Sequence, residues 1–411
     1  MSQARIRGPW ITAPETRAVM AALETARPGG ARFVGGCVRN ALLGAAVDDV
    51  DIATQLTPDQ VIAAVEAAGL RAVPTGYAHG TVTVISSGRP FEVTTLRRDV
   101  ETDGRRAVVA FSEDWREDAA RRDFRLNALY ADSEGEVFDP LDGGLADLAA
   151  RRVVFVGQPE HRIREDYLRI LRFFRFNAWY GRTIDPEGLA ACTALAAGVQ
   201  GLSVERVWKE LKKLLAAQDP RPALRAMKEA GVLAAAAPEA QGLERLEGLI
   251  EKDLDHLFTP DPLLRTAAFV SPAAAAAFAE RMRLSRAEAE RLGAALAPGP
   301  RIVSFLSPRE VRRALYRIGR EAFADQARLA WAVDPLARAA PQWRALLALA
   351  ESWVEPKLDL SGEEILAAGV RPGPSVGLVR REVEEWWIDS DFPEDKLSIV
   401  ERLKAVAQAL G

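Results

Sequence analysis

The spacing of hydrophobic and polar residues changes near residue 160 and divides the chain into two kinds of structure. In the first part, apolar and polar residues alternate in steps of two, which is typical of strands with one buried face. Strands are predicted at 32–34, 50–53, 80–86 and 90–96, a last strand or hairpin at 127–131 and 137–138, and helices at 15–25, 38–43 and 61–68. This part is predicted to be an α/β head on a small twisted sheet.

After residue 160, apolar residues recur every three or four positions, as in amphipathic helices. Proline often stands where a predicted helix begins, and glycine where one ends. Helices are predicted at 161–179, 203–217, 220–230, 242–254, 262–269, 272–282, 285–296, 308–317, 320–332, 341–352, 361–367, 375–388 and 394–409. The second part is therefore predicted to be an elongated all-α arm.

Composition is that of a large globular protein. The 411 residues suggest two to four domains, and 48% of them are hydrophobic. No apolar run approaches the ~20 residues of a membrane span, and no signal peptide is recognisable. Cys37 and Cys192 are too few and too far apart for a disulfide framework or a zinc site. We therefore expect a cytoplasmic protein without a membrane segment.

Charge is unevenly distributed, although the net charge is only -4. This balance argues against a protein that coats nucleic acid non-specifically, but not against a local basic surface. Acidic residues crowd 382–395, and arginines crowd another segment, namely Arg162, Arg164, Arg169, Arg172 and Arg175. A partner with phosphates is expected to bind the arginine segment and to avoid the acidic one.

The first candidate site is a strand that runs into two glycines and then a helix. Gly35 and Gly36 follow the strand, and the helix carries Arg39. Glycines let backbone N–H groups approach phosphate oxygens, and a helix N-terminus adds positive potential. Alone the signal is weak, because such turns more often serve tight packing. The pattern is neither a Walker A loop nor a dinucleotide-binding fingerprint.

A sharper signal is the pair Asp49 and Asp51 at the start of a predicted strand. Residues two apart in a strand point to one face, and two adjacent carboxylates are costly without a cation between them. Mg²⁺ prefers oxygen ligands and suits two-metal phosphoryl transfer. A turn or helix cap would explain Asp49 but hardly Asp51. Glu92 could join the metal site or orient an attacking hydroxyl, but an exposed strand residue explains it equally well.

Four polar residues form the next candidate cluster. Arg121 and Arg122 can neutralise a triphosphate, and Asp123 and Asn127 can fix these arginines or bind a ribose. Taken alone, the cluster would be better explained as a salt-bridged helix end.

These motifs occur in the order of class II tRNA nucleotidyltransferases, the family of CCA-adding enzymes and bacterial poly(A) polymerases, which the chain resembles. The family motifs correspond here to Gly35-Gly36-x-Val38-Arg39, Asp49-x-Asp51, Glu92-Val-Thr-Thr-x-Arg97, Arg121-Arg122-Asp123-Phe124-x-x-Asn127, Glu165-Asp166-x-x-Arg169 and Ser203-x-Glu205-Arg206. The resemblance implies a polymerase-β-like nucleotidyltransferase head at 1–155, a nucleobase-recognition neck at 156–230, and a helical body at 231–355 and tail at 356–411 that bind tRNA.

The resemblance further implies template-independent addition of C, C and A to the tRNA 3′ end from CTP and ATP. Asp49 and Asp51 would hold Mg²⁺, and Glu92 would assist catalysis. The residues expected to bind the nucleotide are Gly35, Gly36, Arg39, Arg121, Arg122, Asp123, Asn127, Asp166, Arg169, Arg172 and Arg175. The sequence decides neither which of Arg121 and Arg122 contacts the triphosphate nor the oligomeric state.

Asp166 and Arg169 are expected to read the base. A spacing of three places them on one face of the predicted helix, with Arg172 and Arg175 continuing the row. Cytosine and adenine both offer an amine donor beside a ring-nitrogen acceptor, which a carboxylate and a guanidinium complement. Uracil and guanine reverse this pattern, and unpaired polar groups give a selectivity of ~10³ or more. An ordinary surface ion pair is the alternative.

Two other functions stay open. Residues 97–118 resemble the flexible loop that permits the switch from C to A in the family, which favours complete CCA addition. A poly(A) polymerase shares nearly every motif, but the acidic balance and the lack of a basic C-terminal extension argue against it. A non-catalytic tRNA-binding relative is disfavoured because Asp49, Asp51, Asp166 and Arg169 are intact.

Overall fold

The computed structural model describes residues 4–103, 106–240 and 242–410. The chain divides into two compact units, Met1–Pro238 and Glu239–Gly411, each of which is described by itself. The four-part division expected from the sequence stays a prediction. No helix in the described ranges is long and apolar enough to cross a membrane.

A seven-stranded sheet forms the centre of the first unit, with the strand order β3-β4-β5-β2-β1-β8-β9. Its strands are β1 (Ala31–Val34), β2 (Asp51–Thr54), β3 (Arg71–Gly76), β4 (Thr81–Ser86), β5 (Arg89–Thr95), β8 (Tyr130–Ala131) and β9 (Val137–Phe138). Strands β2 and β5 are parallel, and the other neighbours are antiparallel. The expected mixed α/β head is confirmed, and β3 is a strand that the sequence analysis missed.

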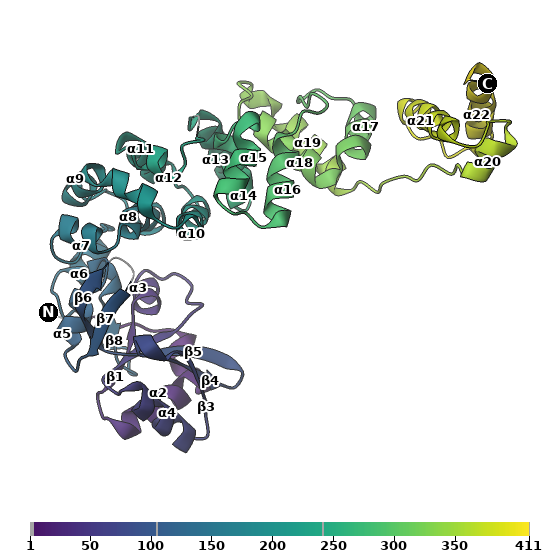
Figure 1. The fold of residues 1–411 in the computed structure, drawn as a ribbon. Coiled ribbons are helices and arrows are strands. Elements are labelled where there is room, and N and C mark those ends of the chain that lie inside the picture. Colours follow the sequence, from purple (N-terminus) through teal and green to yellow (C-terminus); the bar gives the residue numbers. More distant parts are fainter. Residues whose placement is uncertain (1–3, 104–105, 241, 411) are drawn as a thin grey trace. The chain divides into compact units, whose positions relative to one another are not determined.

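Helices α2 and α4 cover one face of this sheet (Figure 1). The helices of the head are α1 (Pro9–Thr12), α2 (Pro14–Ala26), α3 (Gly36–Leu42), α4 (Pro58–Ala67), α5 (Trp115–Ala120) and α6 (Gly144–Ala149). Val82 and Val84 of β4 are fully buried, and they pair with the buried Val93 and Phe91 of β5. Because side chains alternate along a strand, Glu92 lies on the opposite face, where it is exposed.

The segment expected to be a flexible loop forms a β-hairpin instead. Strands β6 (Arg97–Asp103) and β7 (Arg106–Phe111) pair antiparallel as a separate two-stranded sheet, from Arg97 opposite Phe111 to Asp103 opposite Arg106. The expectation rested on the charged residues, but the run Ala107–Phe111 contains the β-branched and aromatic residues that favour strands. Arg105, part of that expected loop, lies outside the described residues.

Six helices complete the described part of the first unit: α7 (Pro159–Glu165), α8 (Leu168–Tyr180), α9 (Pro186–Ala194), α10 (Val204–Leu215), α11 (Arg221–Glu229) and α12 (Val232–Ala236). The prediction of a single helix at 161–179 is wrong, because the helical structure is interrupted at Asp166. The backbone of Asp166 is extended (φ -155°, ψ 106°), and its carboxylate accepts the Leu168 N–H at 3.1 Å. This side-chain bond satisfies a free N–H at the start of α8, which explains why a new helix begins there.

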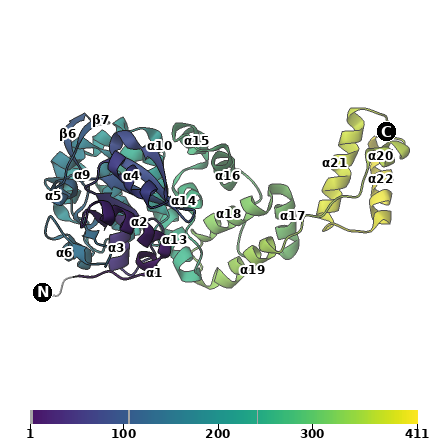
Figure 2. The ribbon, with the colours of Figure 1, turned by 90° about the horizontal axis from the view of Figure 1, so that it is seen from below.

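The second unit is helical in all its regular described structure, as predicted. Figure 2 shows α17, α18 and α19 together and α20, α21 and α22 as a further group. The helices are α13 (Glu244–His256), α14 (Pro262–Phe269), α15 (Ala275–Arg281), α16 (Arg286–Leu296), α17 (Pro308–Ile318), α18 (Arg320–Trp331), α19 (Ala340–Glu351), α20 (Gly362–Ala367), α21 (Pro374–Asp389) and α22 (Lys396–Leu410). In the group of α17, α18 and α19, the rings of the buried Trp331 and Trp343 stack with their centroids 6.3 Å apart.

The acidic segment 382–395 is partly neutralised by α17. Arg317 pairs with Glu385 at 2.6 Å, Arg313 with Asp389 at 2.5 Å, and Arg312 with Asp391. The sequence analysis treated these acids only as a surface that repels phosphates. In the folded unit, three of them hold the C-terminal helices against α17.

Candidate active site

The three predicted carboxylates come together on neighbouring strands. Asp51 begins β2 and stands opposite Glu92 in the parallel register with β5, and Asp49 precedes the strand by two residues. Asp51 is half-buried, whereas Asp49 and Glu92 are exposed. Among the described residues, no hydrogen bond or ion pair from another side chain reaches any of the three carboxylates.

The pKa of Asp51 responds to the charges around it. Burial raises the pKa of Asp51, and the neighbouring Glu92 and Asp49 charges raise it further, while Arg122 opposes them. Like charges in a partly buried site are unfavourable unless a cation compensates them. The carboxylate pair Asp49 and Asp51 therefore has the chemistry of a site for a hard divalent cation.

The donor set also limits how a metal ion would be held. Within the described ranges, no three His, Cys, Asp or Glu side chains are arranged to hold a metal ion, so Glu92 does not complete a three-residue cluster. Asp49 and Asp51 fit Mg²⁺ nevertheless, because this ion commonly takes one or two carboxylates and completes its shell with water and substrate phosphates.

The glycine turn lies beside this site. Gly35 has φ +71° and ψ -118°, a conformation that side chains rarely adopt, and it caps the N-terminus of α3. A Cβ on Gly35 would meet the Arg122 guanidinium at 3.5 Å, and one on Gly36 would meet the Arg39 guanidinium at 3.8 Å. The Gly35 N–H itself donates to the Leu129 carbonyl at 3.2 Å, so the turn combines two guanidiniums with the N-terminus of α3, which begins at Gly36.

The buried Asp118 binds both Arg121 and Arg122. Its carboxylate accepts bonds from Arg121 at 2.6 Å, from Arg122 at 3.0 Å and from the Tyr130 hydroxyl at 2.6 Å. Although burial alone would raise it, the pKa of Asp118 is held at about 2 by Arg122, Arg121 and Tyr130. Asp118 stands three residues before the arginine pair, but the sequence analysis did not assign it a role.

Arg121 and Arg122 differ in their surroundings. The Arg162 guanidinium donates to the carbonyls of both arginines, at 2.5 Å to Arg121 and at 2.9 Å to Arg122, so these backbone bonds do not separate the two. Arg122 lies beside Gly35 and lowers the pKa of Asp51, so it faces the glycine turn and the carboxylates. The geometry therefore favours Arg122 as the phosphate contact that the sequence could not choose.

Three other predicted nucleotide residues contact one another. Arg39 donates to the side-chain oxygen of Asn127 at 2.5 Å, the Asn127 amide donates to Asp123 at 2.9 Å, and Asp123 accepts from Arg172 at 2.8 Å. Arg39, Asn127 and Asp123 are all buried. Their observed contacts hold the head to α8, and direct contact with a nucleotide stays a prediction for each of them.

Asp166 and Arg169 have different partners because of the break before α8. Asp166 accepts from Arg206 at 2.7 Å and lines a cavity of about 520 Å³ with Arg206 and Tyr167. Arg169 donates to Glu165 at 2.5 Å and to the Arg162 carbonyl at 2.7 Å, and it does not line that cavity. The argument that one continuous helix face carries both residues is therefore wrong, and their joint reading of a base stays a prediction.

Further along α8, the predicted phosphate contacts are paired with carboxylates. Arg175 donates to Glu210 of α10 at 2.5 Å, and Arg172 lies 3.9 Å from the same carboxylate as well as binding Asp123. Glu210 therefore pairs with both of these arginines from α10. A nucleotide phosphate would have to share Arg172 and Arg175 with groups of the protein.

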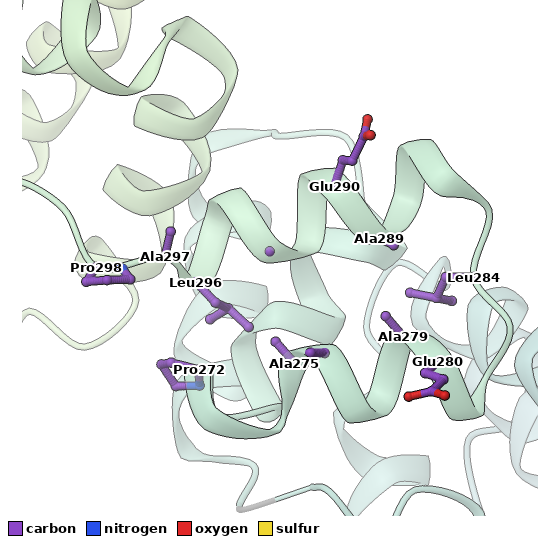
Figure 3. A pocket seen from close by; sticks show the side chains of 12 residues that line it. Pro272, Ala275, Ala279, Glu280, Leu284, Ala289, Glu290, Leu296, Ala297 and Pro298 are labelled. Atoms are coloured by element: carbon purple, nitrogen blue, oxygen red, sulfur yellow. The ribbon is translucent and has the colours of Figure 1, made fainter.

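A second cavity, of about 640 Å³, lies between α15 and α16 (Figure 3). Its lining is mostly small and apolar, as at Ala275, Ala279 and Leu296, and its charged members are Glu280 and Glu290. Without a cation in its lining, it suits neither a triphosphate nor a nucleic-acid backbone. None of the predicted site residues lies there.

Comparison with known proteins identifies the family of this chain. The Poly A polymerase head domain matches residues 31–154, and a domain described as a probable RNA and SrmB-binding site of polymerase A matches residues 181–243. The mitochondrial CCA tRNA nucleotidyltransferase 1 of Mus musculus is 33% identical over 91% of this chain and 86% of its own length. The chain belongs to the CCA-adding tRNA nucleotidyltransferase family. The CCA-adding enzyme of Levilactobacillus brevis is 32% identical over 92% of this chain and 95% of its own.

Solved structures of this family share the fold. The Bacillus stearothermophilus CCA-adding enzyme, in complex with CTP, is 26% identical with a TM-score of 0.76, over 96% of this chain and 98% of the other. The Thermotoga maritima CCA-adding enzyme complexed with tRNA has a TM-score of 0.72 at 17% identity over 98% of this chain and 99% of the other, which shows a shared fold. The expected fold and family are confirmed, and such nucleotidyltransferases generally use divalent metal ions.

Proposed function

We propose that this chain adds C, C and A to the 3′ end of tRNA from CTP and ATP, without a nucleic-acid template. The observation that carries the proposal is identity of about a third, over nearly the whole length, to enzymes named for this reaction. The paired carboxylates beside a glycine turn support the same reaction chemically, because phosphoryl transfer needs both a cation site and a phosphate site.

The reaction is an in-line displacement at the α-phosphorus of the nucleotide. The oxygen of the tRNA 3′ hydroxyl forms a bond to the α-phosphorus, the bond to the α–β bridging oxygen breaks, and pyrophosphate leaves. Asp49 and Asp51 would hold Mg²⁺, which when bound favours loss of the hydroxyl proton and neutralises the leaving group. Glu92, beside Asp51 on the same face, orients the attacking end of the tRNA.

The phosphates are placed by the glycine turn and by one arginine. The N–H groups at the start of α3, from Gly36 onward, and the Arg122 guanidinium, which lies beside Gly35 and lowers the pKa of Asp51, would hold the triphosphate next to the carboxylates. Arg121 supports this arrangement through its bond to Asp118. Among Arg39, Asp123 and Asn127, the observed contacts favour holding the site together over direct phosphate binding.

Base selection belongs to the neck. The Asp166 carboxylate has acceptor capacity beyond its bonds to Arg206 and Leu168, so it can accept the exocyclic amine of cytosine or adenine. Arg169 serves the ring nitrogen once the incoming base lies between the two side chains. Uracil and guanine place a carbonyl against the carboxylate and are rejected.

We further propose the cytoplasm as the place of this activity, following the sequence prediction. The alternative with a specific observation behind it is poly(A) addition, because the matching head and RNA-binding domains carry the name of poly(A) polymerases. The lengths of the products separate the two activities.

The test is extension of a tRNA transcript that ends before CCA, with Mg²⁺ and labelled CTP or ATP, resolved at single-nucleotide length. Addition of two C and one A, followed by a stop, is the expected result. Open-ended A tails would show a poly(A) polymerase. No extension by folded protein that still binds tRNA would show a non-catalytic relative.

A further inference from the structure

A continuous chain of polar contacts runs from the glycine turn of the head to helices α8 and α10. Its members lie on α3, on the segment after α5, on α8 and on α10, so it ties the phosphate site to the base-reading region. In order, the contacting residues are Tyr180, Arg39, Asn127, Asp123, Arg172, Glu210 and Arg175.

Tyr180, the last residue of α8, closes this chain at the head. Arg39 donates to the Tyr180 hydroxyl at 2.8 Å, and its guanidinium also lies over the Tyr180 ring, 4.1 Å from the centroid. Only 7% of Arg39 is exposed, and burial lowers its pKa. A buried guanidinium needs all its acceptors, so each partner of Arg39 restricts where the turn can sit.

We propose that Tyr180 is a positioning residue that couples the phosphate-binding turn to base selection. The inference rests on the proposed function. Within the described residues, Tyr180 bonds to neither the site carboxylates nor Asp166, and it acts through Arg39, whose helix begins at Gly36. Since α8 carries Arg169 and Arg172 and ends at Tyr180, the helix is fixed to the head at both Arg172 and Tyr180.

If Tyr180 couples the glycine turn to α8, loss of its hydroxyl affects phosphate placement and base discrimination together, which a loss of stability alone would not do. Without the Tyr180 hydroxyl, the second terminal nitrogen of Arg39 keeps only Asn40 as a hydrogen-bond acceptor in the described structure, at 3.0 Å. The turn and α8 can then shift relative to each other. Phosphate placement and base discrimination therefore loosen together, for CTP and ATP alike.

The test compares full-length Tyr180→Phe, which keeps the ring, with Tyr180→Leu, which also loses the cation–π contact. The matched control is Trp179→Phe on the same turn, which removes the indole bond to the Lys213 carbonyl at 2.7 Å. Single-turnover rates with CTP, ATP and UTP, the tRNA Kd and the Tm are measured for each variant.

For Tyr180→Phe we expect the single-turnover rate to fall about tenfold with both CTP and ATP, and the CTP/UTP preference to fall severalfold, with Tm and tRNA Kd nearly unchanged. Tyr180→Leu should lose more, and Trp179→Phe nothing. Wild-type rates and preference in Tyr180→Phe, or rates that fall only in proportion to folded protein, would overturn the inference. The wild type run alongside tests the proposed function separately, because it must add CCA whichever way the variants behave.

Discussion

The carboxylates of the head and the charged groups of the neck differ in their bonded partners. Asp49, Asp51 and Glu92 lie together with no cationic side chain bonded to them in the described structure, and burial with these neighbours raises the pKa of Asp51. In the neck, Asp166 is bound to Arg206 at 2.7 Å and Arg169 to Glu165 at 2.5 Å. In the described structure, the three carboxylates of the head have no bonded cationic side chain, whereas Asp166 and Arg169 of the neck are already in ion pairs.

This difference suits the two tasks. A reaction centre must stabilise charge that develops during the reaction, so groups left uncompensated in the free protein interact most strongly with the cation and substrate that arrive. Discrimination between bases needs donors and acceptors that are fixed before the base arrives, because mobile groups would adapt to the wrong base. Under the proposed function, the ion pairs of the neck would provide that fixation.

The largest expected effect is the loss of nucleotide incorporation when a carboxylate of the head is removed. Asp51→Ala should lower incorporation of both C and A by at least about a thousandfold, because a single carboxylate no longer holds the metal ion. The tRNA Kd should stay within about twofold, as measured by filter binding. The neighbouring, exposed Asp48→Ala is the control and should keep its rate. Retained activity in Asp51→Ala would contradict the metal assignment.

The next effect concerns the paired arginines of the head. Asp118→Asn leaves the Arg121 and Arg122 guanidiniums without their buried anion, and we expect the free energy of unfolding to fall by about 3–5 kcal/mol. Urea unfolding measures this change. Asp114→Asn, at the exposed N-cap of α5, is the matched control and should cost about 1 kcal/mol or less. Equal losses in the two variants would show that the Asp118 pairs contribute little.

The same carboxylate predicts acid sensitivity. The pKa of Asp118 is lowered from 3.8 to about 2 in the folded protein, so its stabilisation is fully present above about pH 4 and is lost as the pH falls toward 2. The contribution is about 2 kcal/mol, since one pKa unit corresponds to about 1.4 kcal/mol. Urea unfolding between pH 5 and pH 2 should show a shallower decline for Asp118→Asn than for the wild type. Parallel declines would contradict the assignment.

The smallest expected effect follows from removing the ion pair that holds Asp166 in the neck. Arg206→Ala frees one side of Asp166, and we expect the CTP/UTP preference to fall about tenfold while tRNA binding is kept. Arg286→Ala, which breaks the exposed pair with Glu290 in α16, is the control and should leave the preference unchanged. A normal preference in Arg206→Ala would mean that Asp166 needs no partner.

Local patterns were sufficient for much of this fold. Alternation along residues 80–86 predicted β4, and the order of motifs predicted the head and the carboxylate pair at the start of β2. The break at Asp166 was missed because apolar periodicity runs through it, while a single side-chain bond to the Leu168 N–H decides where α8 begins. Periodicity does not report such local competition.

Long-range pairing was beyond the sequence for a different reason. Asp118 and Arg122 are four residues apart and sit inside a motif, yet the third member, Tyr130, comes from β8. Arg39 and Tyr180 are separated by 141 positions and meet only because α8 packs against the head. Identifying such partners requires the tertiary fold, because neither residue type nor local spacing marks them.

The central claim is that the head performs the chemistry and the neck selects the base, and Asp166→Asn tests it most directly. Asparagine keeps an oxygen for the Leu168 N–H, but its amide replaces the oxygen that accepts from Arg206 and adds a donor that can serve the carbonyl of uracil. Single-turnover rates with CTP and UTP should show the CTP/UTP ratio falling about a hundredfold or more, with the UTP rate undiminished. A fall of both rates together at an unchanged ratio would contradict the separation of chemistry from selection.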